Sequence, residues 1–145
     1  MYSTLEKTIY LKSSDVFGGI AAENLSRLAA IAVESSFSSG SVVFREGDAG
    51  DALYVVMSGS VRIVKEGVEI TTLRKGASFG EMAVLDSAAR SADATVLEDA
   101  VLLRIGSEEF YEALAEDPRL MQNVIAVLTG RLRDATARIV RTSVT

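Results

Sequence analysis

The alternation of apolar and polar residues divides this chain of 145 residues into helical ends and a β-rich middle. Near the N-terminus, residues 4–12 have the composition of a short helix, and Ser3 and Glu6 stand at the spacing of a capping box. In residues 24–33, apolar side chains recur every three or four positions, which predicts a second helix. The small polar residues 35–40 then predict a break in regular structure.

Between residues 41 and 106 the pattern changes to short apolar runs separated by turns rich in glycine and aspartate. The pair Ser58 and Gly59 is expected to form one of these tight turns. Closely spaced short strands of this kind are typical of a β-sandwich or a β-barrel. The predicted strands are residues 42–44, 53–57, 61–63, 69–73, 94–96 and 101–105.

Two more helices are expected in residues 107–145. Ser107 stands where it can cap the first of them. Asp117 and Pro118 begin the final helix as its N-cap and its first helical residue. The long apolar stripe of that helix predicts packing on the barrel, or pairing with a second copy of the helix in a homodimer. The stripe consists of Met121, Val124, Ile125, Leu128, Leu132, Ala135 and Ile139.

The composition is that of a soluble globular domain, because 48% of the residues are apolar and 24% are charged. No apolar run approaches the roughly 18 residues that cross a bilayer. The N-terminus also lacks the basic-then-apolar order of a secretory signal. We therefore expect a single domain, residues 1–145, in the cytoplasm, either complete or cut from a longer protein. It divides into N-terminal helices (1–40), a β-barrel (41–106) and C-terminal helices (107–145).

The net charge of −5 argues against general binding to nucleic acid. The charge is uneven, however, because several arginines lie near the C-terminus. They are explained by a solvated helix face that compensates the helix dipole, or by contact with a partner or a ligand. These residues are Arg131, Arg133, Arg138 and Arg141.

The chain contains no cysteine and no histidine. Disulfides, iron–sulfur clusters, zinc ribbons and Cys–His or Ser–His nucleophilic sites are therefore excluded. An enzyme would have to work with carboxylates, lysine, arginine and hydroxyl groups alone. Because paired carboxylates at a metal-type spacing are also lacking, we expect neither catalysis nor a metal or other cofactor.

The most informative segment of the chain leads from Glu81 to Arg90. Gly80 precedes it, and residues 81–85 have the length of one or two helical turns, whose N-terminal amides favour an anion. Arg90 can hold two phosphate oxygens at once, and Ser91 adds a hydroxyl donor beside it. Glu81 can accept a hydrogen bond from a sugar hydroxyl. The arrangement suits a cyclic phosphate joined to a ribose.

Each of these residues also has a purely structural explanation. Arg90 could pair with Asp86 or Asp93 on the surface, and Glu81 could be an ordinary carboxylate in the first turn of a helix. Their joint occurrence between two β segments, in a chain with no rival site, favours the ligand site.

This segment resembles the phosphate-binding cassette of cyclic-nucleotide-binding domains. The family pattern is Phe-Gly-Glu, a small or apolar stretch, then Arg followed by Ser, Thr or Ala, and then Ala. Ala89 departs from many members, which have proline there, and this loosens the turn without removing a ligand contact. The resemblance covers residues 15–140. The matching residues are Phe79, Gly80 and Glu81, followed by Arg90, Ser91 and Ala92.

The resemblance implies an eight-stranded jelly-roll β-barrel with N-terminal helices and a C-terminal lid helix pair. It implies that Glu81 holds the ribose 2′-hydroxyl, while Arg90 holds the phosphate together with Ser91 and the amides of residues 80–83. On the final helix, Arg131 is an implied lid contact, with Leu128 and Leu132 as apolar alternatives. The implied ligand-binding residues are Phe79, Gly80, Glu81, Met82, Ala83, Arg90, Ser91, Ala92 and Arg131.

A sensor function follows from the resemblance. A regulatory domain of this kind signals the binding of a cyclic nucleotide through its C-terminal helix to an effector outside these residues. We expect cAMP rather than cGMP, because a threonine after the arginine tends to accompany cGMP and Ser91 stands there. No helix-turn-helix segment follows the barrel, so we expect no DNA-binding domain. The alternatives are a jelly-roll interaction module that binds no nucleotide, and the regulatory domain of a membrane channel or transporter.

Overall fold

The computed structural model describes residues 1–144, and their side chains as far as residue 141. Helix α1 (Thr4–Lys12) begins where the sequence predicts, and its capping box is formed. The Ser3 hydroxyl accepts a hydrogen bond from the Glu6 amide, and the Glu6 carboxylate accepts one from the Ser3 amide, both at 3.1 Å. Helix α2 (Ala22–Ile31) packs beside α1 and buries Leu25, Leu28 and Ala29.

Strand β1 (Val33–Phe37) is the first difference from the sequence prediction. It occupies the first half of the segment that was expected to be a break, and the preceding helix ends earlier than expected. β1 runs antiparallel to β6 (Asp93–Gly106), with Val33 opposite Arg104 and Phe37 opposite Ala100. The prediction was wrong because this pairing is non-local. Small polar residues are tolerated in β1 because it stands at the edge of the sheet.

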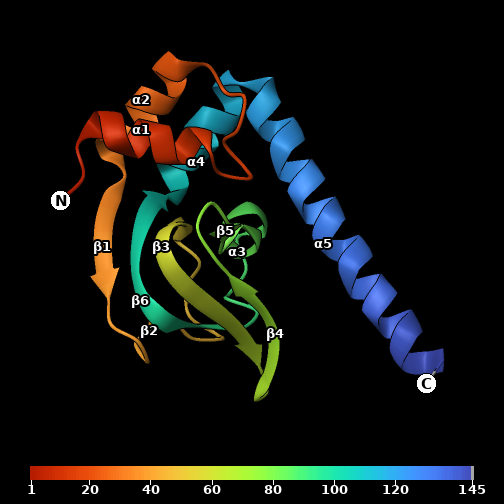
Figure 1. Ribbon diagram of the computed structural model, residues 1–145. Helices are drawn as coiled ribbons and strands as arrows, with labels where there is room; N and C mark the ends of the chain where they lie inside the picture. Colours follow the sequence, from red (N-terminus) through yellow and green to blue (C-terminus); the bar gives the residue numbers. More distant parts are fainter. Residues whose placement is uncertain (145) are drawn as a thin grey trace.

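The strands form one antiparallel sheet in the order β1, β6, β3, β4 (Figure 1). β3 spans Ala52–Lys65 and β4 spans Val68–Leu73. Two short strands complete the sheet: β2 (Val42–Phe44) pairs with β6, and β5 (Ser78–Phe79) pairs with β3. The predicted fold class, a mainly antiparallel jelly roll with flanking helices, is confirmed. Within residues 1–144, however, the strands number six rather than eight, and the sheet is not closed.

The strand count differs because β3 and β6 are long strands that continue through positions expected to separate shorter ones. Ser58 and Gly59 lie inside β3, where the register against β6 shifts between Val56 and Val61. Gly59 has a φ of 77°, and a Cβ there would stand 2.1 Å from the carbonyl oxygen of Asp99. This glycine therefore marks a bulge that bends a continuous strand, and not the predicted turn.

The helices, except the short one that follows β5, gather at one end of the sheet, and the last of them leaves it (Figure 1). α1, α2 and α4 (Ser107–Glu116) lie together, and α5 (Pro118–Val144) runs from that end past β4 (Figure 1). Asp117 caps α5 as predicted, since its carboxylate accepts a hydrogen bond from the Arg119 amide at 3.0 Å. Ser107, in contrast, is the first residue of α4, and Gly106 takes the N-cap position. No helix within residues 1–144 is long and apolar enough to span a bilayer.

Two buried apolar clusters hold this arrangement together. The first lies between the helices and the sheet and includes Phe17, Leu103 and Val84. The second lies within the sheet and includes Val61 and Phe79. Since Phe79 belongs to β5 and Val84 to α3 (Glu81–Asp86), the predicted ligand-binding segment is anchored in both clusters.

Candidate functional site

The segment that leads to Arg90 starts with a sharp turn between β5 and α3. Gly80 is the N-cap of α3 and has a φ of 85°, in the left-handed region that favours glycine. A Cβ at Gly80 would also stand 2.7 Å from Nη1 of Arg90, so a side chain there would displace the guanidinium. α3 spans the residues expected to form one or two helical turns, which confirms that prediction.

The guanidinium of Arg90 is buried and held by backbone. The residue is only 3% exposed. Nη1 donates to the Gly80 carbonyl and Nη2 to the Ala52 carbonyl, each at 2.6 Å. The plane lies over the ring of Phe44, with Cζ 4.1 Å from the ring centroid, a cation–π contact. Burial lowers the pKa of Arg90, and this is opposed by the nearby Tyr54 and carboxylates. Within the described residues, Nε has no hydrogen-bond partner.

The backbone of Arg90 is fixed by the loop before β3. Its amide donates to the Asp48 carbonyl at 2.8 Å, and its carbonyl accepts from the Gly47 amide at 2.9 Å. The surface ion pair with Asp86 or Asp93 that the sequence left open is not formed. Those carboxylates accept hydrogen bonds from nearby backbone amides, at 3.0 and 2.7 Å.

Glu81 is the buried carboxylate of the site. It is 2% exposed, and its Oε1 accepts a hydrogen bond from Nη1 of Arg131 at 2.5 Å. Its Oε2 is buried and has no hydrogen-bond partner within the described residues. Loss of solvation raises the pKa of Glu81 above its ordinary value, and the positive charge of Arg131 opposes this rise. Glu81 is therefore more than a first-turn carboxylate, because it joins α3 to α5.

Arg131 connects α5 to the ligand-binding segment. Besides Glu81, its guanidinium donates to the Ser78 carbonyl, and it lies 3.6 Å from the carboxylate of Asp15 in the loop after α1. The arginine that the resemblance selected is therefore in contact with the cassette. Of the two apolar alternatives, Leu128 packs against the core and Leu132 is exposed.

The remaining predicted residues differ in burial. Phe79 is buried and stacks on Tyr54, with ring centroids 5.3 Å apart. Ala83 is buried within α3, while Met82 and Ser91 are exposed. Ala92 is half-buried. The buried residues, Phe79 and Ala83, therefore pack beneath the surface of the candidate site, whereas Met82 and Ser91 lie on its surface.

Sequence reasoning missed three residues that build the site. Ala52 contributes a carbonyl to Arg90, and Phe44 contributes a ring. Gly50 allows α3 to approach, because a Cβ there would stand 2.2 Å from the Cβ of Ala83. A backbone carbonyl and a missing side chain leave no side-chain pattern, so neither Ala52 nor Gly50 could be recognised in advance.

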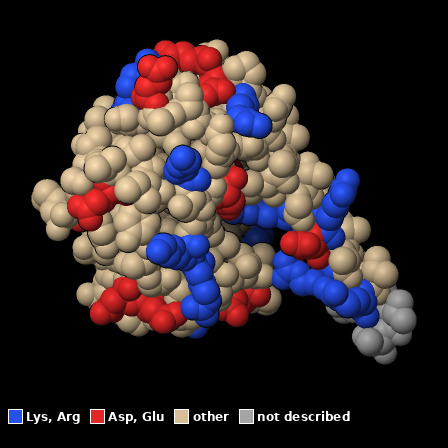
Figure 2. Space-filling model, turned by 45° about the horizontal axis from the view of Figure 1, so that its top comes forward, with Lys and Arg blue, Asp and Glu red and all other residues tan. Residues whose placement is uncertain are grey.

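The space beside α5 is open and positively charged at its edge. Figure 2 shows a hollow between the body of the molecule and the outgoing helix, with Lys and Arg side chains along it. Farther along α5, Nη1 of Arg138 donates to the Ile70 carbonyl of β4 at 2.7 Å. These Lys and Arg side chains would attract an anion, and Figure 2 also shows Asp and Glu side chains at the edge of the hollow.

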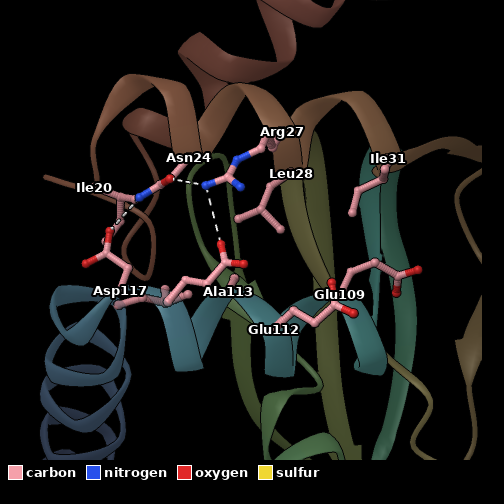
Figure 3. A pocket seen from close by; sticks show the side chains of 11 residues that line it. Ile20, Asn24, Arg27, Leu28, Ile31, Glu109, Glu112, Ala113 and Asp117 are labelled. Atoms are coloured by element: carbon pink, nitrogen blue, oxygen red, sulfur yellow. Dashed lines mark hydrogen bonds and ion pairs between the residues drawn. The ribbon is translucent and has the colours of Figure 1, made fainter.

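A second hollow lies elsewhere, between α2 and α4, and contains none of the predicted site residues (Figure 3). Four of its polar side chains are joined to one another. Arg27 donates to Asn24 at 2.5 Å and lies 3.3 Å from Glu116, while Asn24 donates to Asp117 at 3.2 Å. This hollow lies at a helix–helix contact that a polar network of its own crosses.

Comparison with known proteins identifies the family. The sequence profile described as Cyclic nucleotide-binding domain matches residues 34–117. The chain belongs to this family. The match runs from β1 to the end of α4 and contains the whole cassette, which confirms the resemblance seen in the sequence.

The relatives of this cyclic nucleotide-binding domain include both a receptor protein and an enzyme, by their names. It is 36% identical over 130 residues to the cyclic AMP receptor protein of Thermus thermophilus, covering 86% of this chain and 60% of that protein. It is 32% identical over 138 residues to Glutaminase 1 of Bradyrhizobium diazoefficiens, covering 92% of this chain and 22% of that protein. The chain thus spans only part of these curated relatives.

A solved structure shows the same architecture. The regulatory domain of Toxoplasma gondii PKA, crystallised with cAMP, matches with a TM-score of 0.70 and 27% identity, over 76% of this chain and 44% of that one. The domain is therefore homologous to regulatory domains that bind cAMP.

Proposed function

We propose that this domain is a sensor that binds cAMP in preference to cGMP, between the cassette and α5. In this proposal Arg90 neutralises the cyclic phosphate with help from the Ser91 hydroxyl, and Glu81 accepts a hydrogen bond from the ribose 2′-hydroxyl. The choice of cAMP over cGMP rests on Ser91, which stands where a threonine tends to accompany cGMP.

The observation that carries the proposal is the buried, unpartnered Oε2 of Glu81. A buried polar atom without a hydrogen bond costs about 1–3 kcal/mol, so a carboxylate with a purely structural role is expected to have both oxygens satisfied. Oε1 is satisfied by Arg131, and a ribose hydroxyl would satisfy Oε2. The unpartnered Nε of Arg90 supports the same view, since it leaves one donor for a phosphate oxygen.

Signal transmission is proposed to pass through Arg131. Because Arg131 of α5 and the ribose hydroxyl bind different oxygens of one carboxylate, a bound nucleotide would favour the position of α5 in which Arg131 contacts Glu81. A ligand shifts such an equilibrium only by its difference in affinity for the two states. A difference of about 1.4 kcal/mol changes the ratio of the two states tenfold.

The role proposed for this chain is regulatory and not catalytic. The cyclic AMP receptor protein is a regulator by name, whereas the glutaminase shows that such a domain also occurs within an enzyme. The signal would reach an effector outside these residues, either on the same polypeptide or on a separate protein.

Isothermal titration of the purified chain with cAMP, cGMP and 5′-AMP tests the proposal. We expect cAMP to bind most tightly and 5′-AMP to bind weakly, because its open phosphate carries an additional charge and lacks the ring. Tighter binding of cGMP would overturn the base preference alone. If none of the three binds, the alternative of an interaction module without a nucleotide gains support.

We further propose that α5 pairs with α5 of a second copy. Apolar residues recur along one side of it in alternating steps of four and three, the heptad spacing of a coiled coil. This seam lies about a quarter turn from the face that Leu120, Val124 and Arg131 present to the body, because a helix turns about 100° per residue. Most of the seam is exposed. It consists of Met121, Ile125, Leu128, Leu132, Ala135 and Ile139.

Sedimentation analysis tests this pairing. Leu132→Glu places a charge in the centre of the seam and is expected to convert a dimer into monomers. Ala137→Glu, an exposed residue on the opposite side of α5, is the matched control and should leave the dimer intact. A parent chain that is monomeric at every concentration would contradict the proposal.

A further inference from the structure

Asp15, in the loop between α1 and α2, is a charged residue that the proposed binding mode does not use. Its amide donates to the Gly76 carbonyl at 3.0 Å. Its carboxylate oxygens lie 3.1 and 3.3 Å from the Ser78 amide, which donates to them. The same carboxylate stands 3.6 Å from Nη2 of Arg131. One side chain of the N-terminal region therefore contacts both the strand that leads into the cassette and the C-terminal helix.

Ser78 is the residue on which these contacts converge. Its amide donates to Asp15, and its carbonyl accepts from Arg131. Asp15, Ser78 and Arg131 therefore form a closed ring of contacts, two residues before Gly80. Ser78 is fully buried, so neither of its backbone groups can turn to solvent instead. Arg131 extends the ring to Glu81.

An isolated ion pair between Asp15 and Arg131 would contribute little. Their side chains are 32% and 37% exposed, and pairs at that exposure are usually worth less than about 1 kcal/mol. The ring differs from such a pair because a buried amide fixes the position of the Asp15 carboxylate. The carboxylate then restricts where the flexible arginine side chain can place its charge.

We propose that Asp15 is a positioning residue for the nucleotide site. It holds Arg131 in the orientation in which the guanidinium binds Oε1 of Glu81, and this leaves Oε2 for the ribose hydroxyl. Through it the N-terminal helices are coupled to the cassette and to α5. The part of this inference that concerns affinity rests on the proposed function, whereas the part that concerns α5 does not.

Two substitutions separate the contacts of Asp15. Asp15→Asn keeps an oxygen that accepts from the Ser78 amide but removes the charge that attracts Arg131, whereas Asp15→Glu keeps the charge. We expect Asp15→Asn to weaken cAMP binding about threefold in calorimetry, and Asp15→Glu to restore part of that loss. Asp134→Asn, the same change at an exposed position of α5, is the control and should leave the affinity unchanged.

A double-mutant cycle distinguishes positioning from general stability. If Asp15 acts through Arg131, Asp15→Asn should have no further effect on affinity once Arg131 is replaced by glutamine. Equal losses with and without Arg131 would overturn the proposal.

Hydrogen exchange without nucleotide provides a readout that does not depend on ligand binding. We expect Asp15→Asn to accelerate exchange of the amides around Arg131 in α5, while the amides of β3 and β6 remain protected. Unchanged exchange in α5 would overturn the proposal. A parent chain that binds no cyclic nucleotide would instead refute the proposed function, and the exchange result would still decide the role of Asp15.

Discussion

Two arginines stand at the candidate site, Arg90 within the cassette and Arg131 on α5, and they are held in different ways. Arg90 is buried, and its guanidinium donates to the carbonyls of Gly80 and Ala52 beneath the ring of Phe44. Arg131 is 37% exposed and is held mainly by carboxylates, one of which is Glu81. The first arginine lies between α3 and β6 and is held against the sheet, whereas the second lies on a helix that leaves the sheet.

The difference separates a fixed binding group from a movable one. Carbonyls of β3 and of the turn before α3 cannot shift without disrupting the sheet, so the guanidinium of Arg90 is fixed in place, as the proposed binding of a phosphate requires. The guanidinium of Arg131 is partly exposed, so its ion pairs are screened by salt more than a fully buried pair would be, and its contacts depend on the position of α5. A ligand that bridges the two regions can therefore move the helix while the cassette stays in place.

The largest effect is expected from replacing Arg90, the arginine that backbone carbonyls hold in place. Arg90→Ala should weaken cAMP binding at least tenfold, because a charge-assisted contact is worth about 1.5–3 kcal/mol. It should also lower the free energy of unfolding, since the carbonyls of Gly80 and Ala52 lose their donors. Calorimetry and urea unfolding measure the two effects. Arg90→Lys, which keeps the charge, should be better folded yet still bind weakly, and unchanged affinity in either variant would contradict the assignment.

Replacing a glycine by alanine should change the free energy of unfolding in opposite directions beside the cassette and in α5. Gly50→Ala adds a Cβ that overlaps the Cβ of Ala83 and should lower the free energy of unfolding by about 1–3 kcal/mol. Gly130→Ala, in α5 where nothing lies within 4 Å of the added Cβ, should raise it by about 0.5–1 kcal/mol. Thermal or urea unfolding tests both. Equal effects at the two positions would show that the cassette packs no more tightly than the helix.

A smaller effect is expected from replacing Arg131, the arginine of α5. Arg131→Gln should weaken cAMP binding by about threefold to tenfold, because it removes a charge-assisted contact that is partly open to solvent. The structure of the cassette should persist, since Arg90 has separate supports. Arg133→Gln is the control, because Arg133 is exposed on α5 and lies on another side of the helix. Comparable losses in the two variants would indicate a general charge effect.

The smallest effect concerns pH and Glu81, whose pKa is raised by burial. The carboxylate is the form that accepts the ribose hydroxyl, so affinity should fall as the pH drops through this raised pKa, above the ordinary value of 4.5. Glu81→Gln should bind more weakly than the parent at neutral pH, by less than Arg90→Ala, and without that pH dependence. A parallel pH dependence in both proteins would assign the titration to another group.

Without nucleotide, the effect of pH on the stability of the fold is opposite to its effect on affinity. A carboxyl group whose pKa is higher in the folded state favours folding most when protonated. Its contribution is therefore fully present below its ordinary pKa and is lost as the pH rises through the raised value. Unfolding of the parent and of Glu81→Gln, compared over that range, measures this difference.

The sequence alone determined the features that arise from neighbours along the chain. The capping box of α1, the cap at Asp117 and the short helix after Gly80 were predictable because each depends on residues a few positions apart. The residue types of the cassette were equally visible, since Glu81 and Arg90 stand at a fixed spacing within one segment.

Only the tertiary structure decided what depends on distant partners. β1 was missed because its partner strand β6 lies far along the chain, and Gly59 was misread because a bulge and a turn share the same residue. Nor could the carbonyl of Ala52 or the carboxylate of Asp15 be assigned in advance, because backbone groups have no sequence signature and ion pairs across the fold have no spacing rule. Local geometry follows from adjacent residues, whereas burial and pairing follow from packing, and it is packing that buries the side chains of Glu81 and Arg90.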